Sequence, residues 1–269
     1  MKPAPFAYER PSDVAGVLAL LGDGGPQKAI LAGGQSLVLA LARRARTPEL
    51  VIDINRIAGL DAITVDGEGC LVIGATARLE EVRVHPAVRS GWPLIAEALG
   101  LLANPVVRRR GTLVGNLANN GPGCEMAAVA LVLDAEFVVE RLGSDPSRVP
   151  SAIFLELGGT VGFVTAVRFP PPSPGGFAFV ELSRRPQHVC TLGAAVQLGP
   201  AGPVIALAGF ARAIRCTAAE HASTPEALRA VLAADLAGAG SADTLDDYRR
   251  DVAAVLVGDA LAVARSRAA

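Results

Sequence analysis

The sequence of 269 residues predicts an α+β protein, and three features of its pattern support that class. First, an apolar strand at residues 28–31 runs through paired glycines into an apolar helix expected at 37–44. Second, strand, turn and strand alternate with helices from residue 60 onward. Third, a three-stranded antiparallel sheet is expected near the C-terminus, with strands at residues 177–182, 192–198 and 204–210.

Composition and charge exclude several classes of protein. Hydrophobic residues make up 51% of the chain, which is typical of a globular protein and not of a disordered one. The 25 basic and 26 acidic residues give a formal charge of −1, so charge gives no reason to expect binding to nucleic acid or to an anionic membrane. No apolar run reaches the roughly 18–20 residues that span a bilayer, and the N-terminus lacks a signal-peptide core, so we expect a cytoplasmic protein.

Two further elements flank the first strand and helix. A Pro-Ser-Asp start at Asp13 and helically spaced apolar residues predict a helix over 14–21, which the glycine-rich stretch 22–26 ends. Residues 50–54 predict a buried strand that contains Asp53. We interpret Asp53 as a side chain that caps a neighbouring loop, and a contact near a ligand is the second interpretation.

The turn between the first apolar strand and its helix is the first candidate site. Gly33 and Gly34 lack the Cβ that would block close approach of an anion, and glycine reaches the positive φ values of an anion-binding nest. Gln35 and Ser36 then open the helix, so several unpaired backbone N–H groups point one way with the helix dipole behind them. This arrangement suits a phosphate or pyrophosphate, and an ordinary tight turn is the alternative.

The central part of the chain reads as a hairpin followed by helices and strands. Strands at 63–65 and 71–74 flank an Asp-Gly-Glu-Gly turn, which is a strong hairpin signal. The other elements expected here are helices at 79–84, 93–102 and 125–133 and strands at 136–140 and 163–169.

Residues 107–123 form a second candidate loop, which is long, rich in small polar residues and bordered by apolar segments. Thr112 and Asn116 offer hydrogen bonds there, and Gly111 and Gly115 again permit close backbone approach. Two separate glycine loops together favour a dinucleotide ligand. Neither loop has the Rossmann pattern or the P-loop pattern, so we expect neither of those folds.

The arginine run at 108–110 has two interpretations. Its guanidinium groups can pair with phosphate, but a run of charge is more often a solvated face. We prefer the solvated interpretation for Arg109 and Arg110.

The C-terminal part closes with two helices. Thr224 is expected to cap the first of them, with Pro225 at its first position. The closing helix is expected to place five residues on one face, which we interpret as a core-packing face: Tyr248, Val252, Val255, Leu256 and Val263.

The cysteines and histidines are too scattered for a metal site. Cys70, Cys124, Cys190 and Cys216 lie far apart in the sequence and form no C-x-x-C pair, so we expect neither an iron–sulfur cluster nor structural zinc. No residue reads as a nucleophile or as an indispensable general base. The sequence therefore predicts no catalytic residue and no metal ligand in this chain.

Several motifs resemble one known family over nearly the whole chain. The stretch Ala-Gly-Gly-Gln-Ser at 32–36, followed by 50–56, is similar to the first flavin loop of the molybdenum hydroxylase FAD subunits. These are the medium subunits of carbon monoxide dehydrogenase and its relatives, and the FAD domain of xanthine dehydrogenase. Val-Arg at 107–108 and Gly-Thr-Leu-Val-Gly-Asn at 111–116 resemble their second loop, usually T-I-G-G-N. The stretch 179–185 and Tyr-Arg-Arg at 248–250 match as well.

The resemblance implies an FAD whose pyrophosphate lies between the two loops. It assigns one side to Ala32, Gly33, Gly34, Gln35 and Ser36. It assigns the other side to Thr112, Gly115 and Asn116. Glu125 matches an acidic position, usually Asp, that binds ribose hydroxyls, and Val164 matches an apolar position beside the cofactor.

The sequence departs from the family pattern at four positions. Gln35 stands where carbon monoxide dehydrogenase relatives usually have His, and Val114 stands where they have Gly. Arg109 replaces a common Asn. Val180 falls where the xanthine dehydrogenase branch carries Lys.

The family also implies a domain division and partners. An FAD-binding domain of the PCMH/vanillyl-alcohol-oxidase-like type is expected at 1–170, in subdomains of about 1–57 and 58–170, with a smaller C-terminal domain at 175–269. Electrons are expected to come from a small two-[2Fe–2S] subunit and a large molybdenum-cofactor subunit, and to leave through FAD to an external acceptor. Two alternatives remain open at this point: a stand-alone FAD-dependent oxidoreductase in a biosynthetic pathway, and a degenerate, cofactor-free scaffold subunit suggested by Val114.

Overall fold

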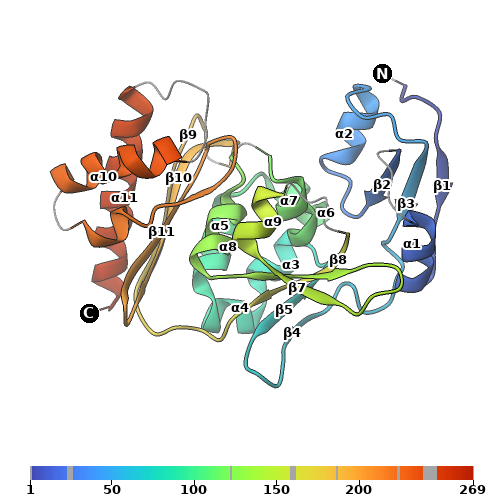
Figure 1. Ribbon diagram of the computed structural model, residues 1–269, viewed down its shortest axis with the longest axis horizontal. Coiled ribbons are helices and arrows are strands. Elements are labelled where there is room, and N and C mark those ends of the chain that lie inside the picture. Colours follow the sequence, from blue (N-terminus) through green and yellow to red (C-terminus); the bar gives the residue numbers. More distant parts are fainter. Residues whose placement is uncertain are drawn as a thin grey trace.

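The computed structural model describes residues 2–22, 27–121, 123–157, 162–185, 187–222, 225–238 and 247–268. Three sheets follow one another along the molecule: the N-terminal sheet lies at one end, the C-terminal sheet at the other, and a helix-rich part lies between them (Figure 1). The α+β class is therefore confirmed. None of the helices in the described ranges is both long and apolar enough to cross a lipid bilayer.

The N-terminal part is a three-stranded parallel sheet in the order β1-β3-β2. Its elements are β1 Ala7–Glu9, α1 Val14–Leu21, β2 Lys28–Leu31, α2 Leu37–Ala42 and β3 Leu50–Asp53. As expected, Asp13 caps α1, and its side chain accepts the Gly16 N–H at 2.7 Å. Most of the glycine-rich stretch expected to end α1 lies outside the described residues. Helix α2 is shorter than expected, because Arg44 has a φ of 56° that no helix continues through.

The central part is a five-stranded antiparallel sheet in the order β4-β5-β8-β6-β7, packed against helices. One large apolar core joins them, in which the rings of Phe137 and Phe154 stack at 3.7 Å between centroids. Helix α8 is buried around its whole circumference. The elements are β4 Ile63–Val65, β5 Leu71–Gly74, α3 Leu79–Val84, α4 Pro86–Gly91, α5 Pro93–Leu101, α6 Pro105–Arg110, α7 Leu113–Asn119, α8 Glu125–Val132, β6 Glu136–Glu140, β7 Ser147–Pro150, α9 Ser151–Glu156 and β8 Phe163–Phe169.

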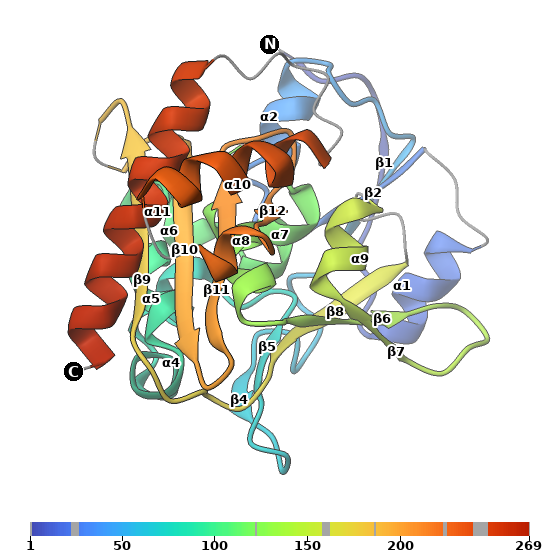
Figure 2. The same cartoon turned by 60° about the vertical axis from the view of Figure 1, so that its left-hand side comes forward.

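The C-terminal part is an antiparallel sheet in the order β12-β11-β10-β9. The three expected strands form it, and a two-residue strand adds a fourth at the edge. Helix α11 lies against β9 and β10, and α10 packs on α11 (Figure 2). The elements are β9 Phe177–Ser183, β10 Cys190–Gly199, β11 Gly202–Ala208, β12 Ile214–Arg215, the 3₁₀ turn Ala219–His221, α10 Pro225–Gly238 and α11 Asp247–Ala268. The expected cap residue Thr224 lies outside the described residues.

The expected long loop at 107–123 is largely helical, so that prediction is wrong. Its arginines end α6, and α7 begins directly after Gly111 and Thr112. Asn104 starts α6 by accepting the Val107 N–H at 3.0 Å, with Pro105 at the first helical position. Helices of six or seven residues are too short for apolar periodicity to distinguish them from a loop.

The predicted packing face of α11 is correct for three of its five residues: Leu256 is buried, and Val252 and Val263 pack against the C-terminal core. It is wrong for Tyr248, which is 64% exposed, and for Val255, which is 52% exposed. The other residues of the packing face are mostly alanine: Ala253, Ala254, Val257, Ala260, Leu261 and Ala264. Small side chains let helix α11 approach the segment before β9 closely. No side chain would fit at Gly176 in that segment, because a Cβ there would lie 2.6 Å from the Ala264 carbonyl carbon.

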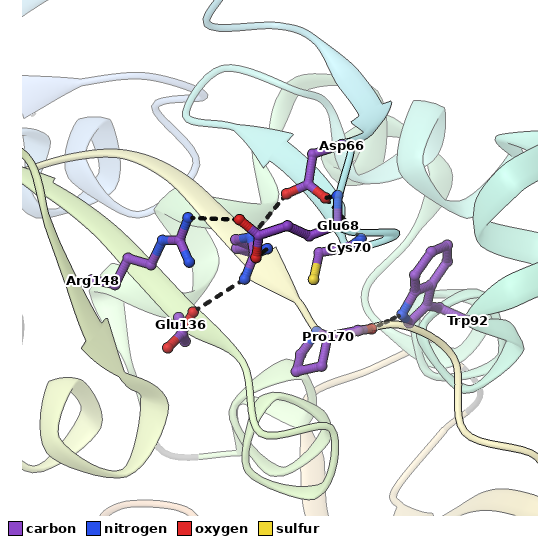
Figure 3. Close-up of polar contacts among 8 residues, drawn as sticks. Asp66, Glu68, Cys70, Trp92, Glu136, Arg148 and Pro170 are labelled. Carbon is purple, nitrogen blue, oxygen red and sulfur yellow. Dashed lines mark hydrogen bonds and ion pairs between the residues drawn. The ribbon is translucent and has the colours of Figure 1, made fainter.

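An ion network fixes the β4–β5 hairpin to the rest of the central sheet (Figure 3). The buried guanidinium of Arg168 on β8 lies 2.9 Å from Asp66, 2.7 Å from Glu68 and 3.5 Å from Glu136. The backbone N–H of Cys70 and the Arg168 guanidinium hold the pKa of Asp66 below its ordinary value. Three carboxylates thus share the Arg168 guanidinium, and Glu68 has Arg148 as a second, more distant partner.

Replacing Arg168 with Met should lower the free energy of unfolding by about 2 kcal/mol, because three neighbouring carboxylates lose their shared counter-ion. Arg148→Met is the matched control: that side chain is half exposed and lies 3.7 Å from Glu68, so its loss should cost well under about 1 kcal/mol. Urea unfolding at pH 7 measures both. Equal effects of the two substitutions would contradict the assignment of Arg168 as the shared ion.

Candidate functional site

One cleft of about 720 Å³ brings together all the residues that the sequence assigned to a cofactor. They arrive from four separate segments of the chain, in the N-terminal and central parts. The residues that line the cleft include Ala32, Gly33, Gly34, Gln35, Ser36, Thr112, Gly115, Asn116, Glu125 and Val164. A volume of this size is typical of sites that hold cofactors.

The first loop is shaped by its two glycines in different ways. Gly34 has a φ of 73°, as expected for a glycine turn. Gly33 has no positive φ, so that part of the expectation is wrong for it. Its Cα packs directly against the second loop, where a Cβ would overlap the Arg110 carbonyl oxygen and lie 2.7 Å from the Cα of Gly111. The two loops therefore touch at Gly33.

The start of α2 supplies unpaired donors to the cleft. The backbone N–H groups of Gln35, Ser36 and Leu37 donate to no other group among the described residues, and all three residues line the cleft. The Gln35 side chain bonds within its own loop, donating to the Gly33 carbonyl at 3.3 Å. The Asn55 amide holds the loop from behind, donating to the carbonyls of Leu31 and Ala32 at 3.2 and 2.8 Å.

The second loop is held as a helix start. Thr112 caps α7, and its hydroxyl accepts the Gly115 N–H at 3.1 Å. A Cβ on Gly115 would lie 2.5 Å from that hydroxyl, so glycine is needed for the cap as well as for access to the cleft. The backbone that precedes Thr112 is held by the start of α3, where the Leu79 N–H donates to the Gly111 carbonyl at 2.9 Å. Asn116 accepts the Cys124 thiol at 3.2 Å.

Val114, the most conspicuous departure in this loop, sits inside α7. It is 4% exposed and packs in the large central core while also lining the cleft. A side chain at this position is therefore accommodated by the protein core. The hypothesis of a cofactor-free scaffold, which depended on Val114, therefore loses its basis.

Arg108 has a structural role rather than a ligand role. Its buried guanidinium lies 2.8 Å from Glu80 and donates to the carbonyls of Leu102 and Ala103 at 3.0 and 2.6 Å. Arg83 and Arg108 together lower the pKa of Glu80 to about 2. Arg109 and Arg110 are exposed, which agrees with the preferred interpretation of a solvated face.

Asp53 also behaves as interpreted. Its carboxylate accepts the backbone N–H of Asn55 at 2.9 Å and the Asn55 amide at 2.7 Å, which is the local cap that was expected. The Tyr8 hydroxyl donates to its other oxygen.

Glu125 begins α8 and is the buried acid of the cleft. It is 4% exposed. Burial, and then the nearby charge of Glu181, raise its pKa to about 7. Glu125 thus carries a proton in part at neutral pH, and a hydrogen-bond donor that favours its ionised form would remove that proton.

Other parts of the lining were not expected from the sequence. Lys28 and Arg46 line the cleft from the N-terminal part, and Gln187, His188 and Val189 reach it from the β9–β10 connection. No local pattern marks these residues, because tertiary packing alone brings them to the cleft. Within the described ranges, no group of three or more His, Cys, Asp and Glu side chains is arranged to hold a metal ion.

The pKa of Glu125 predicts a pH-dependent stability of the flavin-free protein. The folded pKa of about 7 lies above the ordinary value of 4.5, so the folded state binds the extra proton and stability falls as pH rises between these values. The loss amounts to about 3 kcal/mol. Glu125→Gln should abolish this part of the pH dependence in urea unfolding between pH 4.5 and 8. The exposed Glu9→Gln is the control, and identical profiles for wild type and Glu125→Gln would refute the assignment.

Comparison with known proteins identifies the family. Residues 4–172 match the family described as FAD binding domain in molybdopterin dehydrogenase. The chain is 33% identical to the carbon monoxide dehydrogenase medium chain of Hydrogenophaga pseudoflava over 100% of both chains. It is 36% identical to caffeine dehydrogenase subunit beta of a Pseudomonas species, over 74% of this chain and 69% of that one.

Solved structures agree with the sequence matches. Carbon monoxide dehydrogenase from Hydrogenophaga pseudoflava, in a form that lacks the Mo-pyranopterin moiety, matches 100% of both chains with a TM-score of 0.88 and 34% identity. Quinoline 2-oxidoreductase from Pseudomonas putida 86 matches over the same extent with a TM-score of 0.85 and 25% identity. The resemblance read from the two loops is confirmed: the chain belongs to the family of FAD-binding medium subunits of the molybdenum hydroxylases.

Proposed function

We propose that the cleft holds one FAD with its diphosphate between the two loops. The observation that carries this proposal is the convergence of all ten assigned residues on one cleft, although they come from four segments of the chain. Ala32, Gly33, Gly34, Gln35 and Ser36 face the diphosphate from one side. Thr112, Gly115 and Asn116 face it from the other.

The residues present fit such a ligand. The unpaired N–H groups at the start of α2 are donors that a diphosphate satisfies. The Glu125 carboxylate accepts from the hydroxyls of a ribose, and Val164 offers an apolar wall beside the cofactor. Because hydroxyl donors favour the ionised carboxylate, FAD binding should lower the pKa of Glu125 from about 7.

The chain acts as the flavin subunit of a molybdenum hydroxylase-type dehydrogenase. When bound, FAD supplies storage for two electrons between one-electron carriers and an external acceptor. The chain's own residues bind it, orient it and shield it from water. Substrate oxidation belongs to other subunits, which the similarity to single chains of multi-subunit dehydrogenases supports.

Electrons must enter from another chain. The four cysteines are buried and unpaired, and their places in the sequence give no cluster of thiolates for an iron–sulfur centre. A small subunit with two [2Fe–2S] clusters and a large subunit with the molybdenum cofactor fill this need. They are the partners of this chain.

The domain division and the location complete the proposal. Residues 1–170 form the FAD-binding domain, with subdomains of about 1–57 and 58–170, and 175–269 form the C-terminal domain. A second apolar cluster, formed only by residues from 178 onward, supports a separate C-terminal domain, and one face of its sheet packs on the central core through Phe179, Ala195 and Ala206. The protein works in the cytoplasm.

Gly33 gives a direct test of the flavin site. Gly33→Ala should lower FAD affinity at least about tenfold, because its Cβ overlaps the Arg110 carbonyl and forces the two loops apart. Gly100→Ala is the control, since a Cβ there meets nothing within 4 Å. The measurement is fluorescence titration of the flavin-free proteins, with circular dichroism to establish folding. A folded Gly33→Ala protein with unchanged affinity would refute the placement, and so would release of FMN instead of FAD from the denatured wild type.

The need for partners gives a second test. The isolated chain, mixed anaerobically with candidate substrates, should show no substrate-dependent bleaching of its flavin absorbance. Co-expression with the neighbouring subunits should give a complex in which substrate bleaches it. Rapid, stoichiometric reduction in the isolated chain would overturn the subunit role and favour a stand-alone oxidoreductase.

A further inference from the structure

A second cavity, of about 530 Å³, shares the Ala32–Gln35 loop with the flavin cleft. The polar side chains that line this cavity are Asp53, Asn55, Arg78, Arg109 and Arg110. We call this second cavity the arginine cavity. The proposed flavin site uses none of these five side chains. We propose that the arginine cavity is a binding site for a small phosphate monoester.

The charges that line the arginine cavity do not balance. Three guanidinium groups are present with one carboxylate, that of Asp53. This carboxylate is already occupied by the Tyr8 hydroxyl, by the backbone N–H of Asn55 at 2.9 Å, and by Arg10, whose Nε lies 3.7 Å away. The cavity therefore keeps an excess of positive charge inside a concave wall, where the field is concentrated.

The arginines also keep free donors. Arg78 is fixed by two neutral acceptors, the Arg110 carbonyl at 2.8 Å and the Asn55 side-chain oxygen at 2.7 Å, so no described carboxylate neutralises it. Arg109 and Arg110 make no side-chain hydrogen bond or ion pair with the part of the chain that the structure describes. One fixed and two unpaired guanidinium groups are suited to the several oxygens of a phosphate dianion.

The size of the cavity favours an organic phosphate over a bare ion. Inorganic phosphate would leave much of the volume to water, whereas a monoester also places an organic group against Leu31 and Val38. The arginines line a concavity that is partly open to solvent, and Arg109 and Arg110 are exposed in it. An acidic side chain of a partner protein is the other possible occupant, and the test below separates the two.

The shared loop links the two sites. Ala32, Gly33, Gly34 and Gln35 line both cavities, so a ligand in the arginine cavity touches the loop that faces the diphosphate. Binding at one site should therefore change affinity at the other, and the factor must be the same in both directions. This coupling rests on the proposed flavin position, whereas the phosphate site itself does not.

The test uses the flavin-loaded chain, so that the cleft is filled. Glycerol 3-phosphate is titrated by calorimetry, with glycerol as the uncharged control. Saturable binding below about 10 mM is expected for the phosphate alone. Arg109→Gln/Arg110→Gln should weaken it at least about tenfold while the protein keeps its FAD. The control is Arg89→Gln/Arg265→Gln, which removes two exposed charges elsewhere and should change affinity less than about twofold.

The remaining outcomes either contradict the phosphate site or separate it from the flavin site. Absence of saturable binding, or an equal loss in both double variants, would overturn the site. Loss of partner binding in Arg109→Gln/Arg110→Gln, without any glycerol 3-phosphate binding to wild type, would assign the cavity to a protein partner. If the chain binds no FAD but still binds glycerol 3-phosphate, the proposed flavin site fails and the phosphate site stands.

Discussion

The contact of Gly33 with the backbone of Arg110, Gly111 and Thr112 is the constraint on which the cleft depends. It joins a turn of the N-terminal parallel sheet to the junction of α6 and α7 in the central part. No side chain fits between the two backbones, so the loops lie at a fixed separation. Each loop is then held from behind, the first by Asn55 and the second by the β5–α3 connection. The proposed diphosphate site thus lies where two backbones are brought together.

The sequence allowed much of this arrangement to be predicted where local chemistry decides it. Asp13 at the start of α1 and the Asp-Gly-Glu-Gly turn are read correctly because a cap and a hairpin depend on neighbours in the chain. The family resemblance and its cofactor also followed from two short loops. The ten assigned residues gather in one cleft, and their roles as FAD ligands stay a prediction.

The remaining features could not be predicted from the sequence, and the reasons are physical. Helices α6 and α7, of six and seven residues, are too short to show a period. The buried stripe of α11 consists mainly of alanine, and a search for large apolar residues selects the solvent-facing Tyr248 and Val255 in its place. Residues 187–189 reach the cleft by packing between parts distant in sequence, which no local pattern records.

The participation of Gln187, His188 and Val189 in the cleft bears on biosynthesis. Its walls extend along the chain from Leu21 to Val189, and the segments that form them belong to the parts that carry all three sheets. A ribosome that has finished only the first two sheets has therefore made a flavin pocket with one wall missing. The cleft gains its last lining residues only when the C-terminal sheet has been translated and has docked, so assembly of the complete cleft is a late step in the maturation of the chain.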